Sequence, residues 1–349
     1  MKIAIDCRMY NSSGIGTYIR EILPYMIETE NEFLLIGKKS ELEEYENLMN
    51  IEIQECDIPI FSPKEVFFFP IKKINKCDIF YTPNYNIPGG IKVPIYSTIH
   101  DVIFLDMPEL TSKLGGLIRK IFYKRAYYLS KTIFTVSNFS KKRIEYHLGN
   151  KKDIVITYNG VSKHILEDDG AVYKKKDYII FVGNIKKHKG LKTLLLAYKE
   201  AKKEGLTSGL VIVGNQNNFK TKDSEIIEIL EKSEDEGIIF TGYVNNKELK
   251  KLIAEAKVLV QPSLYEGFGI PPLEALVLGT SIVVSDIEVF KEIYNNLDIE
   301  FFEVNNWKKL KELLKMNERI KSCSNLKNKQ IRFTYKECSE KIKRKIFNG

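Results

Sequence analysis

Thirteen short runs of β-branched and aromatic residues recur along the chain, separated by segments with helical spacing of apolar residues. The runs are apolar almost throughout, not at every second position, which indicates strands buried on both faces. Strands that alternate with helices form parallel sheets covered by helices. The predicted strands are 2–6, 33–37, 51–55, 79–83, 94–100, 132–137 and 154–158, then 178–183, 209–214, 237–242, 258–263, 281–285 and 299–304.

The chain is long enough for two domains. Its 349 residues exceed the roughly 250–300 residues at which a single hydrophobic core stops growing. The strands fall into sets of seven and six, which predicts an α/β fold of two doubly wound, Rossmann-like domains facing across a cleft. A polar stretch at 161–177 indicates the junction, so we expect domains at 1–165 and 166–332, followed by a helical segment at 333–349.

Composition excludes several classes of protein. The chain is 44% hydrophobic and 29% charged, as soluble globular proteins are, and it has no apolar run of the roughly 18 residues that a membrane-spanning helix needs. The first residues reach Asp6 without a long apolar stretch, so no cleaved secretion signal is expected. Five scattered Cys without a C-x-x-C pair and four separated His predict a cytoplasmic protein with reduced thiols and no metal site.

The net charge of +8 is concentrated near the end of the chain. Residues 307–349 carry 14 Lys and Arg against 4 Asp and Glu, while the remainder carries 40 against 42. Such a basic tail is attracted to anionic membranes or to nucleic acid. It is also what a solvated helix surface looks like, and the sequence leaves both interpretations open.

A loop with two glutamates, "YEGFGIPPLEA" at 265–275, follows a predicted strand. Proline suits the first turn of a helix, so we expect a helix from Pro271 with Glu274 in its first turn, where the helix dipole stabilises a carboxylate by about 0.3–1 kcal/mol. Glycines at 267 and 269 let the main chain approach a ligand. Two carboxylates around a set of amide donors can hold a sugar. The alternative is that Glu274 only caps a helix and Glu266 is solvated.

Two other segments follow predicted strands and carry polar side chains. Lys186, Lys187, His188 and Lys189 precede a helix expected from Gly190, and cations at a helix N-terminus form a diphosphate site. The alternative is a solvated basic turn. The pair at 100–101, His then Asp, can exchange a proton with a bound hydroxyl, or His100 can be structural.

Glycines 14 and 16 precede a predicted helix but do not form the dinucleotide fingerprint. Ile19 occupies the place of its third glycine, and the loop from Asp6 is too long for its tight turn. An NAD enzyme is therefore disfavoured. A glycine loop facing the cleft can still contact a phosphate.

Together these segments resemble the retaining glycosyltransferases of the two-domain GT-B fold, specifically the large family-4 group. The resemblance covers nearly the whole chain and is most specific in the E-x7-E pattern with P-S-x-x-E-G-F-G. The segments that carry it are "IDCRMYNSSGIGTYIREIL", "TIHDVIFLDMPE", "TVSNFSKKRI", "ITYNGV", "FVGNIKKHKGLKTLLLAY", "FTGYVNNKELKKLIAEAKVLVQPSLYEGFGIPPLEALVLGTSIVVSD" and "RFTYKECSEKIKRKIF". The last is similar to the family's helix that crosses back to the first domain.

The resemblance implies a role for each matching residue. Glu266, His100 and Lys189 would be catalytic, with Glu266 stabilising a positive sugar centre and Lys189 the leaving diphosphate. Glu274 would hold the ribose. Asn184 and His188 stand where the family often has an arginine, so Lys186 or Lys187 would replace that cation. The implied donor-binding residues are Gly14, Gly16, Asn184, Lys189, Tyr243, Val244, Gly267, Phe268, Gly269, Ile270 and Glu274.

The implied reaction retains the configuration of a hexose moved from a GDP-, UDP- or dTDP-linked donor to a saccharide or lipid-linked saccharide in cell-surface polysaccharide synthesis. Front-face attack and a covalent intermediate both remain open. No D-x-D motif occurs, which argues against the metal-dependent type, so we expect a metal-independent hexosyltransferase. We also expect no cofactor and no nucleic-acid partner. The alternatives are another enzyme of this architecture, an epimerase or a phosphorylase, or a non-catalytic partner subunit; a requirement for acceptor separates the first two from transfer.

The segment at 113–131 interleaves basic and aromatic residues. One interpretation is an interfacial helix that meets a lipid-linked acceptor at the inner face of the cell membrane. The other is a helix whose aromatic residues belong to the core.

Overall fold

The computed structural model describes residues 1–12, 14–214, 237–316 and 332–348, which form two compact units. Unit 1 comprises Met1–Gly160 and Phe333–Gly349, and unit 2 comprises Val161–Arg332. The units therefore divide after Gly160, a few residues before the boundary expected from the sequence. Among the described residues, no helix combines the length and apolarity needed to span a bilayer.

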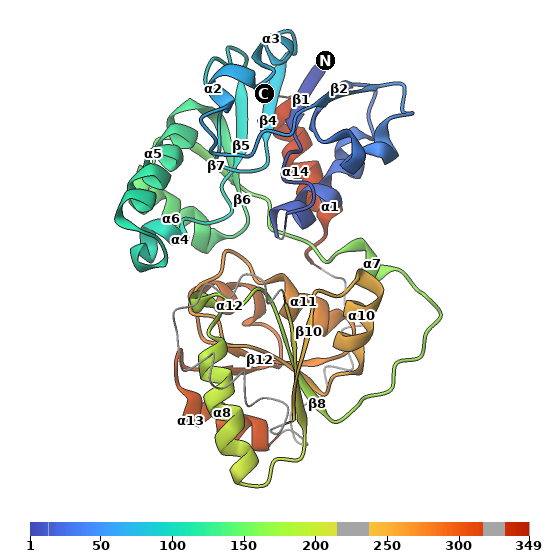
Figure 1. The fold of residues 1–349 in the computed structure, drawn as a ribbon, viewed down its shortest axis with the longest axis vertical. Coiled ribbons are helices and arrows are strands. Elements are labelled where there is room, and N and C mark those ends of the chain that lie inside the picture. The colour runs from blue at the N-terminus through green and yellow to red at the C-terminus, as the bar shows by residue number, and fades with distance from the viewer. Residues whose placement is uncertain (13, 215–236, 317–331, 349) are drawn as a thin grey trace. The chain divides into compact units, whose positions relative to one another are not determined.

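Unit 1 is built on a seven-stranded parallel sheet with helices on both faces (Figure 1). All seven strands predicted in the first half are confirmed, with small shifts at their ends. In sheet order they run β3-β2-β1-β4-β5-β6-β7. Their bounds are β1 Lys2–Asp6, β2 Glu32–Gly37, β3 Ile51–Glu55, β4 Ile79–Thr82, β5 Ile95–Thr98, β6 Ser130–Thr135 and β7 Asp153–Ile156.

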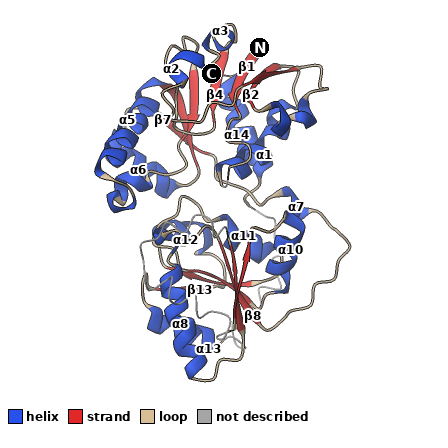
Figure 2. Ribbon diagram, in the orientation of Figure 1, coloured by secondary structure: helices blue, strands red, loops and turns tan. Residues whose placement is uncertain are grey.

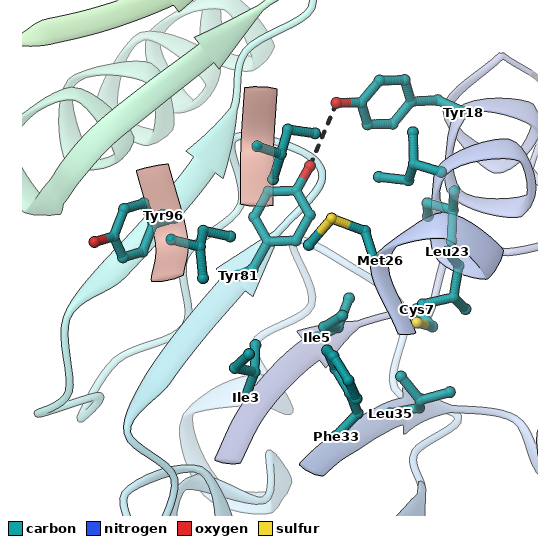
Figure 3. Close-up of a cluster of buried hydrophobic side chains, with 14 of the residues drawn as sticks. Ile3, Ile5, Cys7, Tyr18, Leu23, Met26, Phe33, Leu35, Tyr81 and Tyr96 are labelled. Carbon is teal, nitrogen blue, oxygen red and sulfur yellow. Dashed lines mark hydrogen bonds between the residues drawn. The ribbon is translucent and has the colours of Figure 1, made fainter. Parts of the chain in front are cut away.

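Both faces of this sheet are buried, which explains the continuous apolar runs. Along β1, Ile3 and Ile5 belong to one core cluster and Ala4 to another. Figure 3 shows the first cluster, where Tyr18 and Tyr81 meet through their hydroxyls at 3.4 Å. The Tyr81 hydroxyl also lies 2.8 Å from Thr98 Oγ1, so polar groups buried in this core are paired with one another.

The helices of unit 1 include the end of the chain. They are α1 Ile15–Ile27, α2 Glu65–Phe68, α3 Ile71–Ile74, α4 Ile103–Asp106, α5 Lys113–Leu129, α6 Asn138–Leu148 and α14 Tyr335–Phe347. Short 3₁₀ turns lie at Lys39–Glu41, Glu43–Tyr45 and Pro108–Leu110. Helix α14 packs on α1, where Ser339 Oγ donates to the Ile22 carbonyl at 3.3 Å. The predicted final helix is thus confirmed.

Unit 2 is built on a six-stranded parallel sheet with the order β10-β9-β8-β11-β12-β13. All six strands predicted in the second half are present: β8 Tyr178–Val182, β9 Gly209–Val213, β10 Ile238–Gly242, β11 Val258–Gln261, β12 Ser281–Ser285 and β13 Glu300–Phe302. The described helices are α7 Lys163–Leu166, α8 Leu191–Lys203, α10 Asn246–Glu255, α11 Ile270–Val277, α12 Glu288–Tyr294 and α13 Trp307–Lys315, with a 3₁₀ turn at Lys187–Lys189. Helices α8 and α13 lie side by side and bury one face of the sheet (Figure 2).

Each sheet has one point where the strand order reverses. In unit 2, β8 and β11 are neighbours, but β8 leads outward to β9 and β11 leads outward to β12. In unit 1 the corresponding neighbours are β1 and β4. In doubly wound folds, the carboxyl ends of the strands at such a point form a crevice that binds ligands. We therefore look for a functional site at these two places.

Candidate functional site

Two loops meet at the point of reversal in unit 2. One runs from β8 through Lys187–Lys189 to α8, and the other runs from β11 to α11. The Leu264 amide donates to the His188 carbonyl at 2.8 Å. A Cβ on Gly190 would lie 1.8 Å from the Pro262 carbonyl oxygen, and the φ of Gly190 is +68°. Only glycine suits this position, because the backbones of the two loops are in direct contact.

The centre of the site is an ion pair between these loops. Lys189 Nζ lies 2.7 Å from each of the two carboxylate oxygens of Glu266. Ser263 Oγ donates to Glu266 Oε1 at 2.8 Å, and Gln261 Nε2 lies 3.4 Å from the same oxygen. Glu266 is only 9% exposed. A buried carboxylate needs a charged partner and hydrogen-bond donors, and this one has both, so its side chain is fixed in place.

Aromatic residues of α12 pack against the glycine loop before α11 and form a hydrogen bond with it. Gly269 has a φ of +93°, and a Cβ there would lie 2.3 Å from the Phe290 ring. The Tyr294 hydroxyl donates to the Gly269 carbonyl at 2.6 Å. Phe268 is buried and Gly267 is partly exposed. The main chain at Gly269 is therefore fixed by packing and by a hydrogen bond, as a preorganised set of amide donors requires.

Glu274 corrects one expectation. Helix α11 begins at Ile270 and has no acidic residue in its first turn, so Glu274 lies in the second turn, beyond the strongest effect of the helix dipole. Ser162 Oγ donates to Glu274 Oε1 at 2.7 Å instead, and the carboxylate is 5% exposed. A hydroxyl from the first residues of unit 2 therefore orients this side chain.

The basic turn carries fewer charges than its sequence suggests. Burial, together with the neighbouring positive charge of Lys189, lowers the pKa of His188 to about 4, so this ring is neutral at pH 7. Lys186 and Lys187 are exposed, and Lys189 is partly exposed. Helix α8 starts directly after this turn with Gly190 as its N-cap, which has no side chain to cap the helix. Three lysines and a helix N-terminus therefore share one place.

The residues predicted to meet the base lie further along the same sheet edge. Tyr243 and Val244 follow β10, the edge strand, and Tyr243 is 83% exposed. Strand β9 separates them from β8, which Asn184 follows. The Gly214 amide donates to the Gly242 carbonyl at 3.1 Å, which joins the ends of β9 and β10. Tyr243 and Val244 therefore follow the carboxyl end of β10, and two strands, β9 and β8, lie between β10 and β11, the strand that precedes Glu266.

His100 belongs to unit 1 and is a neutral ring. Its Nε2 lies 3.0 Å from the Pro83 carbonyl, which can only accept, so Nε2 carries the proton and Nδ1 is left as an acceptor. Burial lowers the pKa of His100 to about 4. The Tyr18 ring packs edge-on against it at 4.7 Å. Both a structural and a ligand-binding interpretation of His100 are compatible with this geometry. The hydrogen bond from Nε2 fixes the ring, and Nδ1 can still accept a hydrogen bond.

The glycines at 14 and 16 have different surroundings. Gly14 is exposed with a φ of +69°, and a Cβ there would meet nothing within 4 Å. Gly16 is buried, and a Cβ would lie 2.5 Å from the Tyr10 carbonyl and 2.7 Å from the Met9 carbonyl. Close packing of α1 on the loop after β1 therefore accounts for Gly16 without any ligand.

Sequence reasoning missed a polar cluster at the point of reversal in unit 1. Arg8 Nη2 lies 2.7 Å from Asp6 Oδ2, and Arg8 Nη1 lies 2.5 Å from Glu65 Oε1. Asn86 Nδ2 donates to the same Glu65 oxygen at 2.7 Å. The ionic side chains are 2–6% exposed. The available signal is a cation, Arg8, just after the first predicted strand, where the carboxyl end of a parallel strand places candidate site residues.

Among the described residues, no group of three or more His, Cys, Asp and Glu side chains is arranged to hold a metal ion. Four cysteines, Cys7, Cys56, Cys77 and Cys338, are buried free thiols. Cys323, the fifth, lies outside the described residues.

Comparison with known proteins agrees with this geometry. The family model for glycosyl transferases group 1 matches residues 162–336. The O-antigen chain mannosyltransferase RfbU of Salmonella typhimurium is 31% identical over 205 residues, which cover 57% of this chain and 54% of that protein. O-antigen chain mannosyltransferase B of Escherichia coli is 28% identical over 226 residues, covering 62% and 58%. The chain thus matches a little over half the length of these relatives.

A solved structure is similar over its whole length. HepE of Anabaena, crystallised in complex with UDP and glucose, superposes with a TM-score of 0.75 at 15% identity, covering 100% of both chains. At 15% sequence identity, this structural similarity is evidence for the fold alone. The family match spans the part of unit 2 that carries the Glu266–Lys189 pair. This chain therefore belongs to the glycosyl transferases group 1 family and has the GT-B fold.

Proposed function

We propose that the protein is a retaining hexosyltransferase that moves a sugar from a nucleoside diphosphate to a saccharide or lipid-linked saccharide acceptor in cell-surface polysaccharide synthesis. The observation that carries the proposal is the bidentate pair of Lys189 and Glu266 at the point of reversal between β8 and β11. The pair brings together Lys189, which can bind the anionic diphosphate, and Glu266, which can stabilise positive charge that develops on the sugar.

The charges of the site suit a sugar diphosphate. Among the described side chains of the two loops, Lys187 and Lys189 supply two positive charges against the single negative charge of Glu266, which leaves an excess for a diphosphate. The start of α8 adds amide donors beside them. When the diphosphate forms an ion pair with Lys189, the carboxylate of Glu266 becomes available to stabilise positive charge on the sugar. Stabilisation of both separating charges is what the reaction requires, without a metal or cofactor.

Further roles follow from the same geometry. Glu274, oriented by Ser162, would accept hydrogen bonds from the ribose hydroxyls. The amides between Gly267 and Ile270 would contact the sugar. His100 would accept a hydrogen bond from a sugar hydroxyl at Nδ1, since its Nε2 proton is already donated to Pro83.

The relatives favour mannose as the first sugar to test. Two of them are named as O-antigen chain mannosyltransferases. A structural neighbour holds UDP and glucose, so a UDP-linked donor is the first competitor. We therefore propose GDP-mannose ahead of UDP-glucose and dTDP-rhamnose.

Thermal unfolding with these three donors tests the proposal. A donor at about 100 times its dissociation constant adds roughly 2.7 kcal/mol of stability. We expect one donor to raise the melting temperature by several degrees, and Lys189→Met to abolish most of that rise. Lys174→Met, at an exposed position of unit 2, is the matched control. If none of the donors shifts the transition, the proposed substrate class is wrong.

Turnover then separates transfer from the other chemistries. The preferred donor is incubated with methyl glycosides of mannose, glucose, galactose and rhamnose, and products are detected by mass spectrometry. Transfer predicts a disaccharide whose formation requires acceptor and whose new linkage keeps the donor configuration. Product formed without acceptor would indicate an epimerase or a hydrolase instead.

A further inference from the structure

Helix α5, Lys113–Leu129, carries an apolar stripe that the fold of unit 1 leaves uncovered. Leu114, Leu117, Ile118 and Ile121 are 69%, 57%, 43% and 57% exposed. Their spacing of three, four and seven residues puts them on one face of the helix. Serine at position 112 caps the helix by accepting from the Gly115 amide at 3.1 Å, so the stripe begins in an ordered first turn.

The opposite face of α5 is the one that attaches it to the unit. Tyr123, Ala126 and Tyr127 are buried there, and Phe122 packs edge-on against Phe61 at 4.8 Å. Arg125, seven residues after Ile118 and four after Ile121, lies on the side of the stripe at the C-terminal end of the helix and donates to the carbonyls of Ile87 and Pro88. The interpretation of the aromatic residues as core is therefore confirmed for Tyr123 and Tyr127. The exposed aliphatic stripe is not needed to hold the helix in place.

Lysines line one side of the stripe. Lys113, Lys120 and Lys124 are exposed and are separated by seven and four residues, which aligns them along one edge of the apolar face. None of the three makes an ion pair within the part of the chain that the structure describes. The surrounding segment, residues 110–144, contains nine Lys and Arg and no Asp or Glu. The charged residues of this segment are thus all of one sign.

We propose that this face of α5, the stripe of Leu114, Leu117, Ile118 and Ile121 with the flanking lysines, docks in the surface of an anionic lipid bilayer. The apolar side chains enter the boundary between headgroups and acyl chains, and the lysines extend to the phosphates. A helix with this pattern lies in the plane of the interface. In Figure 1, α5 runs along the outside of unit 1, beside α4 and α6.

Charge decides between a bilayer and a second copy of the chain. A symmetric dimer through this face would bring its own lysines against each other, since the same patch is used on both copies. An anionic bilayer supplies the opposite charge over the whole length of the helix. Each cation near such a surface contributes about 1 kcal/mol, roughly fivefold in partitioning.

Vesicle flotation tests the proposal on the full chain, and it requires neither donor nor turnover, so its outcome is independent of the proposed function. Vesicles contain equal parts phosphatidylcholine and phosphatidylglycerol, or phosphatidylcholine alone. We expect the protein to float with the first and to remain below the second. Leu117→Gln with Ile121→Gln should lower partitioning at least tenfold, because two buried aliphatic side chains are lost. Lys113→Gln with Lys120→Gln and Lys124→Gln should lower it about a hundredfold.

Two matched variants control for nonspecific effects. Leu48→Gln with Met49→Gln removes two exposed apolar residues near β3, at the other end of the sheet of unit 1. Lys174→Gln with Lys247→Gln and Lys251→Gln removes three exposed charges from unit 2. Both should float as the parent does. Equal loss with the control variants, or a parent protein that stays below the anionic vesicles at low salt, would overturn the proposal.

A fluorescent reporter locates the contact. The chain has one tryptophan, Trp307, in unit 2, so Leu117→Trp in a Trp307→Phe background reports on α5 alone. We expect a blue shift with anionic vesicles and quenching by brominated acyl chains. Leu48→Trp in the same background should show neither. An unshifted Leu117→Trp spectrum in a protein that floats would place the contact elsewhere and reject α5.

Discussion

The two units have the same strand reversal but use it in opposite ways. In unit 1 the cluster at that point, Arg8 with Asp6 and Glu65, has one positive and two negative charges and side chains 2–6% exposed. In unit 2, Lys189 pairs with Glu266 while remaining 22% exposed, and two further lysines lie beside it. One cluster is closed and net negative, and the other is accessible and net positive.

This difference explains which unit would take the anionic part of a substrate. A closed cluster whose charges are paired contributes to the fold and repels a diphosphate. An accessible cluster with excess positive charge can attract and bind a diphosphate. The same topology thus provides a structural ion network in unit 1 and a candidate binding site in unit 2, and variants can test that assignment.

The largest expected effect is on stability, from Arg8→Met. Removing the guanidinium leaves Asp6 and Glu65 buried without a cation, which costs about 3–5 kcal/mol. Lys189→Met should destabilise less, because it leaves one buried carboxylate without a cation instead of two, and Glu266 keeps its hydroxyl donor, Ser263. Urea unfolding of both variants measures the contrast. Equal losses in the two variants would remove the distinction between a closed and an accessible cluster.

The next effect is on turnover, from Glu266→Gln. The amide keeps the size of the side chain but cannot stabilise a positive sugar centre, so we expect a loss of about 10²–10³-fold in kcat. The circular dichroism spectrum should stay unchanged. Glu300→Gln, at an exposed end of β13, should retain full activity. Activity within a few fold of the parent for Glu266→Gln would refute its catalytic role.

The sequence was sufficient for the sheets because each strand signals its own burial. It could not supply strand order, so Tyr243 and Val244 were expected near the nucleotide base without the knowledge that β9 separates them from β8. Both partners of the Lys189–Glu266 pair were expected at the site, but the bond joins positions 77 residues apart.

Two features of the site were missed for local reasons. Glu274 was placed in the wrong turn because α11 starts after Gly269, whose left-handed conformation no sequence pattern specifies. The Arg8 cluster was missed because Glu65 lies in a segment without regular periodicity, 57 residues away.

A smaller effect should follow from Gly190→Ala. The new Cβ would lie 1.8 Å from the Pro262 carbonyl, so the two loops of the site must separate. Gly205→Ala is the matched control, since Gly205 also has a positive φ, +93°, but nothing lies within 4 Å of the new Cβ. We expect the control to lose about 1 kcal/mol from backbone strain alone, and Gly190→Ala to lose more and to bind donor weakly. Identical behaviour would show that the loop contact does not matter.

The last effect is a pH dependence that the two units share. Burial lowers the pKa of both His100 and His188 to about 4, below the value of 6.5 of an unperturbed ring. Between these values the unfolded chain binds a proton that the folded chain does not, so each ring makes stability rise with pH, by up to about 1.4 kcal/mol per unit. The contribution is complete above pH 6.5 and is lost as the pH falls toward 4.

His188→Gln should therefore flatten the curve of unfolding free energy between these limits, measured by urea titration at several pH values. A parent slope in His188→Gln would mean that the ring titrates normally and that the basic turn carries four charges at acid pH rather than three.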